Sequence, residues 1–184
     1  MLKLADNPPS LYPDVSGPMA LGGPWWVGHT KARCEKAFGW DLRERGIAYF
    51  LPLVERVTFS GGRKRRGMMP LFPGYVFFCG DEAARQGALR TDRLCQVIAV
   101  ADQDQLGAEL EQLYRVLREG RVTDPYPGMA VGVRCRVTAG PLKGIAGTLI
   151  RRDGALKFVL QISILGQGAE LMIEPELVEA LEES

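Results

Sequence analysis

The spacing of apolar residues predicts a mixed α/β region in the first two thirds of the chain. From residue 25 to residue 118, strand-like alternation and helix-like periodicity follow one another. Strands are expected in "WWVGHT", "AYFLPLVERVTF", "GYVFFCG" and "CQVIAV", and helices near residues 32–46, 81–90 and 102–120. The order β-α-β-β-α-β-α predicts an α+β domain, in which an antiparallel four-stranded sheet carries flanking helices.

The same pattern divides the rest of the chain. Residues 1–24 contain five prolines and three glycines among few apolar residues, so we expect a flexible leader. The α+β domain is expected over residues 25–119, and a linker rich in proline and glycine over residues 120–128. Residues 129–184 contain short strands separated by glycine turns, which predicts a small all-β barrel.

Composition excludes several classes of function. The chain has 184 residues and a net charge of +1, so any nucleic-acid binding must come from a local patch. "MLKLADNPPS" lacks the cationic start and the apolar run typical of a signal peptide, and no apolar run is long enough to span a membrane. Four scattered cysteines and the single His29 form no metal-binding pattern, and no cofactor is expected. Scattered cysteines are typical of reduced thiols in a cytoplasmic protein. The sequence has no phosphate-binding loop and no nucleophile motif, so we expect a protein that is not an enzyme.

The stretch "PLFPGYVFF" is unusually aromatic for a strand that only fills a core. Strand alternation places Tyr75 and Phe77 on one face, with Val76 and Phe78 on the other. Phe77 and Phe78 are therefore predicted to be core residues. Phe72 precedes the strand and is poorly placed for the core, so Phe72 and Tyr75 are candidates for an interface as well as for packing.

A basic run lies just before this strand. "SGGRKRRG" places Arg63, Lys64, Arg65 and Arg66 between glycines, as expected at an exposed hairpin tip. The run is either a solvated face or a site of weak, sequence-independent contact with phosphates. Because no aromatic residues interleave it, base stacking is not expected there.

Two motifs resemble those of a known family. "VRCRVTAGPLKGIAGTLI" has the spacing V-x-x-G-P-x-x-G-x-x-G of the KOW motif, and "LFPGYVF" after a basic loop resembles the signature strand of the NusG amino-terminal domain. The order of elements from residue 25 to residue 182 is similar as well. "WWVGHTKARCEKA", "FLPL" and "DPYPGMAV" resemble specialised paralogues, such as RfaH and the capsule-operon antiterminators, more than housekeeping NusG.

The resemblance implies a monomeric transcription elongation factor that suppresses pausing and termination. It implies that the amino-terminal domain binds the clamp helices of the largest RNA polymerase subunit. The residues implied in that contact are Phe72, Pro73 and Tyr75, with Trp25 and His29 on the first strand. For His29, a hydrogen-bonded surface position is the alternative.

Nucleic-acid contact is the second implied role of the amino-terminal domain. Upstream or non-template DNA would meet the basic run Arg63, Lys64, Arg65 and Arg66. The first helix offers the further candidates Lys36, Arg43 and Arg45.

The resemblance further implies an SH3-like KOW barrel that recruits another protein, typically a small-subunit ribosomal protein or, in NusG itself, Rho. The implied partner-binding residues are Leu142, Ile162, Ile164 and Leu165. Strand alternation prevents the last three from all pointing inward, so Leu165 is either exposed or covers the end of the barrel. The glycines and β-branched residues favour a barrel over a helical hairpin.

A rival hypothesis is a ribosome-associated RNA-binding protein that uses the KOW barrel alone. It requires a strongly basic barrel, whereas residues 130–184 carry six basic and seven acidic side chains. This balance favours a protein partner for the barrel.

Overall fold

The computed structural model describes residues 7–126, 130 and 132–181, apart from the side chains at 58–60, 63, 65, 123, 125 and 175. The chain divides into two compact units, residues 1–103 and 104–184. Among the described residues, no helix is both long and apolar enough to cross a membrane.

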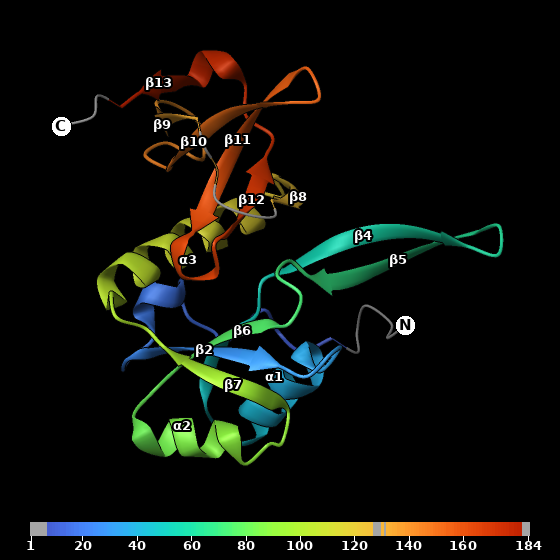
Figure 1. Cartoon of the computed structure of the whole chain (residues 1–184), viewed down its shortest axis with the longest axis vertical. Helices are drawn as coiled ribbons and strands as arrows, with labels where there is room; N and C mark the ends of the chain where they lie inside the picture. Colours follow the sequence, from blue (N-terminus) through green and yellow to red (C-terminus); the bar gives the residue numbers. More distant parts are fainter. Residues whose placement is uncertain (1–6, 127–129, 131, 182–184) are drawn as a thin grey trace. The chain divides into compact units, whose positions relative to one another are not determined.

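The first unit is built on a five-stranded antiparallel sheet (Figure 1). Four of its strands lie in the predicted segments, so the predicted α+β fold is confirmed. The predicted strand "AYFLPLVERVTF" is divided at Leu51 and Pro52 into a sheet strand and a hairpin strand. The sheet order is β1-β3-β6-β2-β7, with the bounds Leu11–Tyr12, Ala48–Phe50, Tyr75–Cys79, Trp25–Thr30 and Leu94–Ala99.

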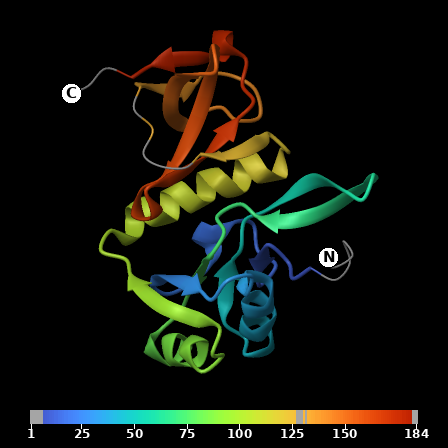
Figure 2. The same cartoon turned by 45° about the vertical axis from the view of Figure 1, so that its right-hand side comes forward.

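Helices α1 (Glu35–Glu44) and α2 (Glu82–Leu89) cover one face of this sheet (Figures 1 and 2). The edge of the Phe38 ring of α1 meets the Phe78 ring of β6, with centroids 6.1 Å apart and planes at 90°. Val76 and Phe78 both belong to this core and are fully buried. The expected alternation along β6 is therefore confirmed on its helix-covered face.

The amino-terminal segment differs from the flexible leader that we expected over residues 1–24. Within the described residues 7–24, β1 pairs with β3, where Leu11 lies opposite Phe50 and Tyr12 opposite Tyr49. The Leu51 amide donates to the Ser10 carbonyl at 2.7 Å. Backbone pairing and the stacking of Tyr12 on Tyr49 offset the cost of ordering a segment whose composition alone predicts disorder.

Strands β4 (Leu53–Ser60) and β5 (Arg63–Pro70) form a separate two-stranded ribbon that projects beyond the end of the sheet (Figures 1 and 2). Gly61 and Gly62 form its two-residue turn with φ of +59° and +72°, as a type I′ hairpin turn requires. The hairpin is as predicted, but the basic run is not in its loop. It occupies the first four positions of β5 instead.

The second unit combines helix α3 (Gln103–Arg118) with a six-stranded antiparallel sheet, here called the C-terminal sheet. An all-β segment after the third helix was predicted, and it is confirmed. Two short 3₁₀ helices, η3 (Ser163–Leu165) and η4 (Pro175–Leu177), interrupt the strands. The strand order is β13-β9-β10-β11-β12-β8, with the bounds Val178–Ala180, Val133–Val137, Ala146–Arg152, Ala155–Ile162, Gln167–Leu171 and Val122–Tyr126.

The boundary between the units differs from the predicted linker at residues 120–128. Strand β8 lies inside that range and pairs with β12, and α3 groups with the C-terminal sheet. Polar side chains of α3 bond to Ala146 of β10, to Ser163 of η3 and to the loop between β9 and β10, and helical periodicity does not reveal such bonds.

Candidate functional site

An aromatic pair lies at the end of the central strands of the first unit. His29 of β2 stands opposite Tyr75 of β6, and their rings stack with centroids 5.0 Å apart and planes at 19°. Both side chains are half-buried, and Pro73 beside them is exposed. The structure thus brings together three of the five residues proposed for the polymerase contact.

Hydrogen bonds to the backbone of the turn before β6 hold this pair in place. Gly74 has φ of +86°, a conformation that favours glycine. Its carbonyl accepts from the Thr30 amide at 2.8 Å, and its amide donates to Oε1 of Glu35 at 2.6 Å. The Pro-Gly step is therefore held between the end of β2 and the start of α1.

Phe72 and Trp25 are placed differently from the other three residues. Phe72 is 1% exposed and Trp25 is 6% exposed. The Phe72 ring meets Phe77 edge-on at 6.4 Å and 89°, and Phe77 in turn stacks on Phe50. In this structure Phe72 is a packing residue beneath the turn, and the His29–Tyr75 pair carries the accessible aromatic surface.

The basic ribbon has a defined register. Lys64 and Arg66 are exposed, and they share one face of the ribbon with Glu55, whose carboxylate lies 3.8 Å from Arg66. Arg63 and Arg65 occupy the alternate positions of β5, and their side chains lie outside the described part of the structure. Four consecutive basic residues in a strand are thus divided between two faces.

The basic residues of α1 have separate environments. Arg43 lies over the Trp40 ring at 5.2 Å, and Arg45 is exposed at the end of the helix. Lys36 donates from Nζ to the Met68 carbonyl, and burial lowers its pKa. Lys36 therefore supports the base of the ribbon in this structure, whereas Arg43 and Arg45 are accessible.

The partner-binding residues proposed for the C-terminal sheet fall into two classes. Leu142 and Ile162 are 5% and 0% exposed and belong to the core. Ile164 and Leu165 lie in η3 and are half-buried. Of the four residues, only these two offer accessible apolar surface.

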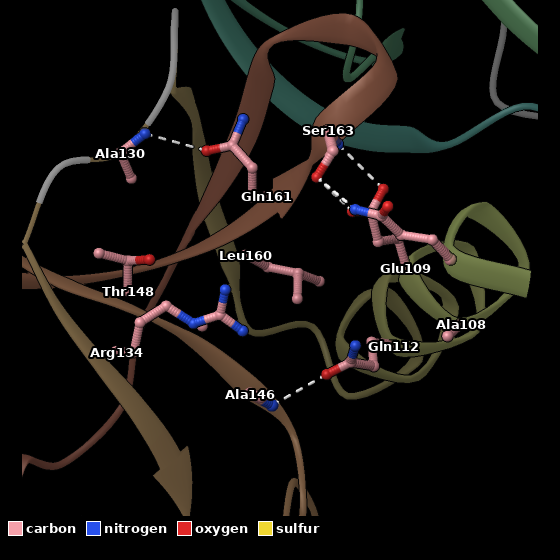
Figure 3. Close-up of a pocket in the computed structure, with 12 residues that line it drawn as sticks. Ala108, Glu109, Gln112, Ala130, Arg134, Ala146, Thr148, Leu160, Gln161 and Ser163 are labelled. Atoms are coloured by element: carbon pink, nitrogen blue, oxygen red, sulfur yellow. Dashed lines mark hydrogen bonds between the residues drawn. The ribbon is translucent and has the colours of Figure 1, made fainter. Parts of the chain in front are cut away.

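The second unit also contains a polar pocket of about 320 Å³ that the sequence did not predict (Figure 3). It lies between α3 and the C-terminal sheet, and Arg134, Thr148 and Gln161 line its sheet side. Glu109 of α3 accepts from the amide and the hydroxyl of Ser163. This pocket borders η3, where the accessible Ile164 and Leu165 lie.

Two further hydrogen-bonding side chains, Gln112 and Arg115, continue this face of α3. Gln112 accepts from the Ala146 amide at 2.9 Å, as Figure 3 shows, and Arg115 donates to the carbonyls of Pro141 and Lys143. Glu109, Gln112 and Arg115 are spaced three residues apart, and this spacing is the only sequence signal for their common role.

A protein-family model is similar to most of the first unit. Residues 23–104 match the family model "Transcription termination factor nusG". The NusG match contains the stacked pair, the Pro-Gly turn, the basic ribbon and helices α1 and α2. The C-terminal sheet lies outside it. The comparison with curated proteins gave no match.

Two solved structures are similar to the chain. One is described as "Domain interaction in Thermotoga maritima NusG", with 18% identity, a TM-score of 0.48, and coverage of 86% of this chain and 97% of that chain. The other is the "MjSpt4:Spt5 complex conformation B", with 15% identity, a TM-score of 0.29 and the same two coverages. Identities and TM-scores this low support no transfer of residue roles.

Proposed function

We propose that the protein is a NusG-like transcription elongation factor that binds RNA polymerase through its first unit. It suppresses pausing and termination, and it recruits a second protein through a KOW-like C-terminal sheet. The match of residues 23–104 to the NusG family supports the coarse role in transcription. The operon-specific, RfaH-like variant of this function remains the finer proposal, based on the motifs of the sequence.

The stacked pair of His29 and Tyr75 is the observation that carries the polymerase contact. It presents aromatic surface next to the exposed Pro73, on a turn that is held at both its amide and its carbonyl. Rigid aromatic groups bury a large area at a low entropic cost, which suits the recognition of a helical partner such as the clamp helices. Phe72 packs beneath the turn against Phe77, and Trp25 is buried at the other end of β2, opposite Cys79.

The ribbon provides the proposed contact with upstream or non-template DNA. Its two strands project from the sheet (Figure 1) and carry basic residues on both faces. Phosphate contacts of this kind position a protein without reading the sequence of the bases. Arg43 and Arg45 extend the available positive charge onto α1.

The C-terminal sheet provides the proposed site for a protein partner, such as a small-subunit ribosomal protein or Rho. Ile164 and Leu165 are the accessible apolar residues of the proposed set. Leu142 and Ile162 are buried core residues.

Binding of the full-length chain to core RNA polymerase tests the proposal. Tyr75→Ala is expected to weaken binding about tenfold or more, as truncation of an aromatic hot spot does. Tyr114→Ala is the matched control, because Tyr114 is a half-buried tyrosine of α3 in the other unit. Absence of binding by the unaltered chain, or equal effects of the two variants, would contradict the proposed contact.

A further inference from the structure

A buried carboxylate lies directly behind the stacked pair. Glu35 is the first residue of α1 and is 7% exposed. Its Oε1 accepts from the Gly74 amide at 2.6 Å, a short distance typical of a hydrogen bond to a charged group. Burying a carboxylate is costly unless it is compensated. Two features stabilise the negative charge of Glu35. One is the partial positive charge at the amino terminus of the helix, and the other is the hydrogen bond donated by the Gly74 amide.

The hydrogen bond to Glu35 holds the peptide unit before Gly74, next to the peptide unit that leads into Tyr75. Gly74 has a positive φ, its carbonyl is held by Thr30, and the Tyr75 amide donates to the Phe72 carbonyl at 3.1 Å. Without the acceptor from Glu35, the Gly74 amide would lose its protein partner in the turn, and the Pro-Gly step could rotate. The ring of Tyr75 would then no longer be held against His29.

Lys36, the next residue, makes a parallel contact with the ribbon. Its Nζ donates to the Met68 carbonyl, near the end of β5. Glu35 and Lys36 therefore hold the two ends of the short segment from Met68 to Gly74, which joins the ribbon to the aromatic turn. The first turn of α1 therefore contacts both proposed surfaces, the aromatic pair through Gly74 and the ribbon through Met68.

We propose that Glu35 is a positioning residue for polymerase binding: it touches no partner and orients the His29–Tyr75 surface through the Gly74 amide. This inference rests on the proposed function. It assigns to Glu35 a role that neither its charge nor its place in a helix indicates. Lys36 has the corresponding role for the ribbon.

Amide NMR of the full-length chain, together with polymerase binding, tests this role. Glu35→Ala removes the acceptor, and Glu35→Gln keeps a neutral acceptor of the same length. Glu44→Ala removes an exposed carboxylate at the other end of the same helix and is the matched control. The Gly74 amide proton is expected to resonate downfield in the unaltered chain, to move strongly upfield in Glu35→Ala, and to move less in Glu35→Gln.

Polymerase affinity is expected to follow the Gly74 signal. Glu35→Ala should weaken binding about tenfold, as expected for losing a hydrogen bond to a charged group. Glu35→Gln should restore most of that loss, and Glu44→Ala should change neither reading. Should Glu35→Ala fail to fold, Glu35→Asp replaces it, because its carboxylate is one methylene too short to reach Gly74.

Two results would overturn the inference. One is a Gly74 signal that does not respond to Glu35→Ala. The other is a shifted Gly74 signal with polymerase affinity unchanged. Failure of the proposed function has a different signature, because the unaltered chain would then not bind polymerase, or Tyr75→Ala would bind as tightly as the unaltered chain.

Discussion

The register of the ribbon predicts that only one of its faces contacts nucleic acid. The position of Arg56 lies opposite Gly67, that of Arg65 opposite Thr58, and that of Arg63 opposite Ser60. Directly opposed residues share a face, so this face carries three basic positions. The other face carries Lys64 and Arg66 together with the acidic Glu55. The expected DNA-facing side is therefore the one with Arg56, Arg63 and Arg65.

The salt dependence of DNA binding gives this prediction a magnitude. Each phosphate contact contributes a slope of about −0.9 in log affinity against log salt, so three contacts give about −2.7. A fourfold rise in salt, from about 50 to about 200 mM, would then lower the affinity about 40-fold. If all four residues of the basic run made contacts, the slope would be about −3.6 and the loss about 150-fold.

Fluorescence anisotropy of a labelled DNA duplex, titrated at several salt concentrations, separates these cases. Arg63→Ala with Arg65→Ala is expected to flatten the slope by about 1.8, since two contacts are lost. Lys64→Ala with Arg66→Ala is expected to change the slope little. The double variant Arg90→Ala with Arg151→Ala removes the same charge from exposed positions outside the ribbon, and it controls for net charge.

Equal flattening by both ribbon variants would refute the one-face geometry, because a ribbon lying against a duplex cannot present both faces to it. Flattening by Lys64→Ala with Arg66→Ala alone would show that the opposite face is in contact. No effect of either variant relative to the control would mean that the basic run is a solvated surface.

Three further predictions concern packing and chemistry in the first unit. Phe72→Ala should lower the free energy of unfolding by about 3–5 kcal/mol, because it empties a fully buried aromatic site. Denaturant unfolding measures this loss, and a loss below about 1 kcal/mol would show that Phe72 does not support the turn. Removal of residues 1–14 should abolish hydrogen-exchange protection of the Leu51 amide and destabilise the unit by about 2 kcal/mol, the scale of burying one leucine side chain; unchanged protection would contradict the pairing of β1. Burial raises the pKa of Cys79 to about 11. Cys79 should therefore resist alkylation at pH 8 while the exposed Cys95 reacts, as mass spectrometry can show. The raised pKa also means that stability is lost as pH rises from about 9 through about 11, since the unfolded chain loses the thiol proton first; flat stability over that range would contradict it.

The aromatic stretch shows how far the sequence determines the site. Alternation alone assigned Val76 and Phe78 to one face of β6, and the structure confirms their place under α1. The same rule could not place Phe72, because Phe72 precedes the strand and its environment depends on the turn at Gly74. Its burial involves an edge-on contact with Phe77, which in turn stacks on Phe50 of another strand.

Long-range bonds account for the other differences. The pairing of Leu11 with Phe50 joins residues far apart in sequence, and a segment rich in proline carries no periodic signal for it. The sequence could not indicate Glu35 as a site residue for a similar reason, because its partner is a backbone amide 39 residues away. Local periodicity predicts elements and their faces, whereas such polar bonds are found only once the elements are assembled.

The short strand β1 also has a consequence for solubility. The unpaired edge of a sheet is a template on which another chain can add a strand. Strand β3 belongs to the aromatic segment "AYFLPLV", which would make its bare edge a strong template for self-association. β1 covers this edge for two residues and is followed at once by Pro13, which cannot donate to a further strand. The exposed edge of the sheet is therefore a two-residue strand, too short to pair stably with a strand of another chain. A chain that lacks the amino-terminal segment should aggregate at lower concentration.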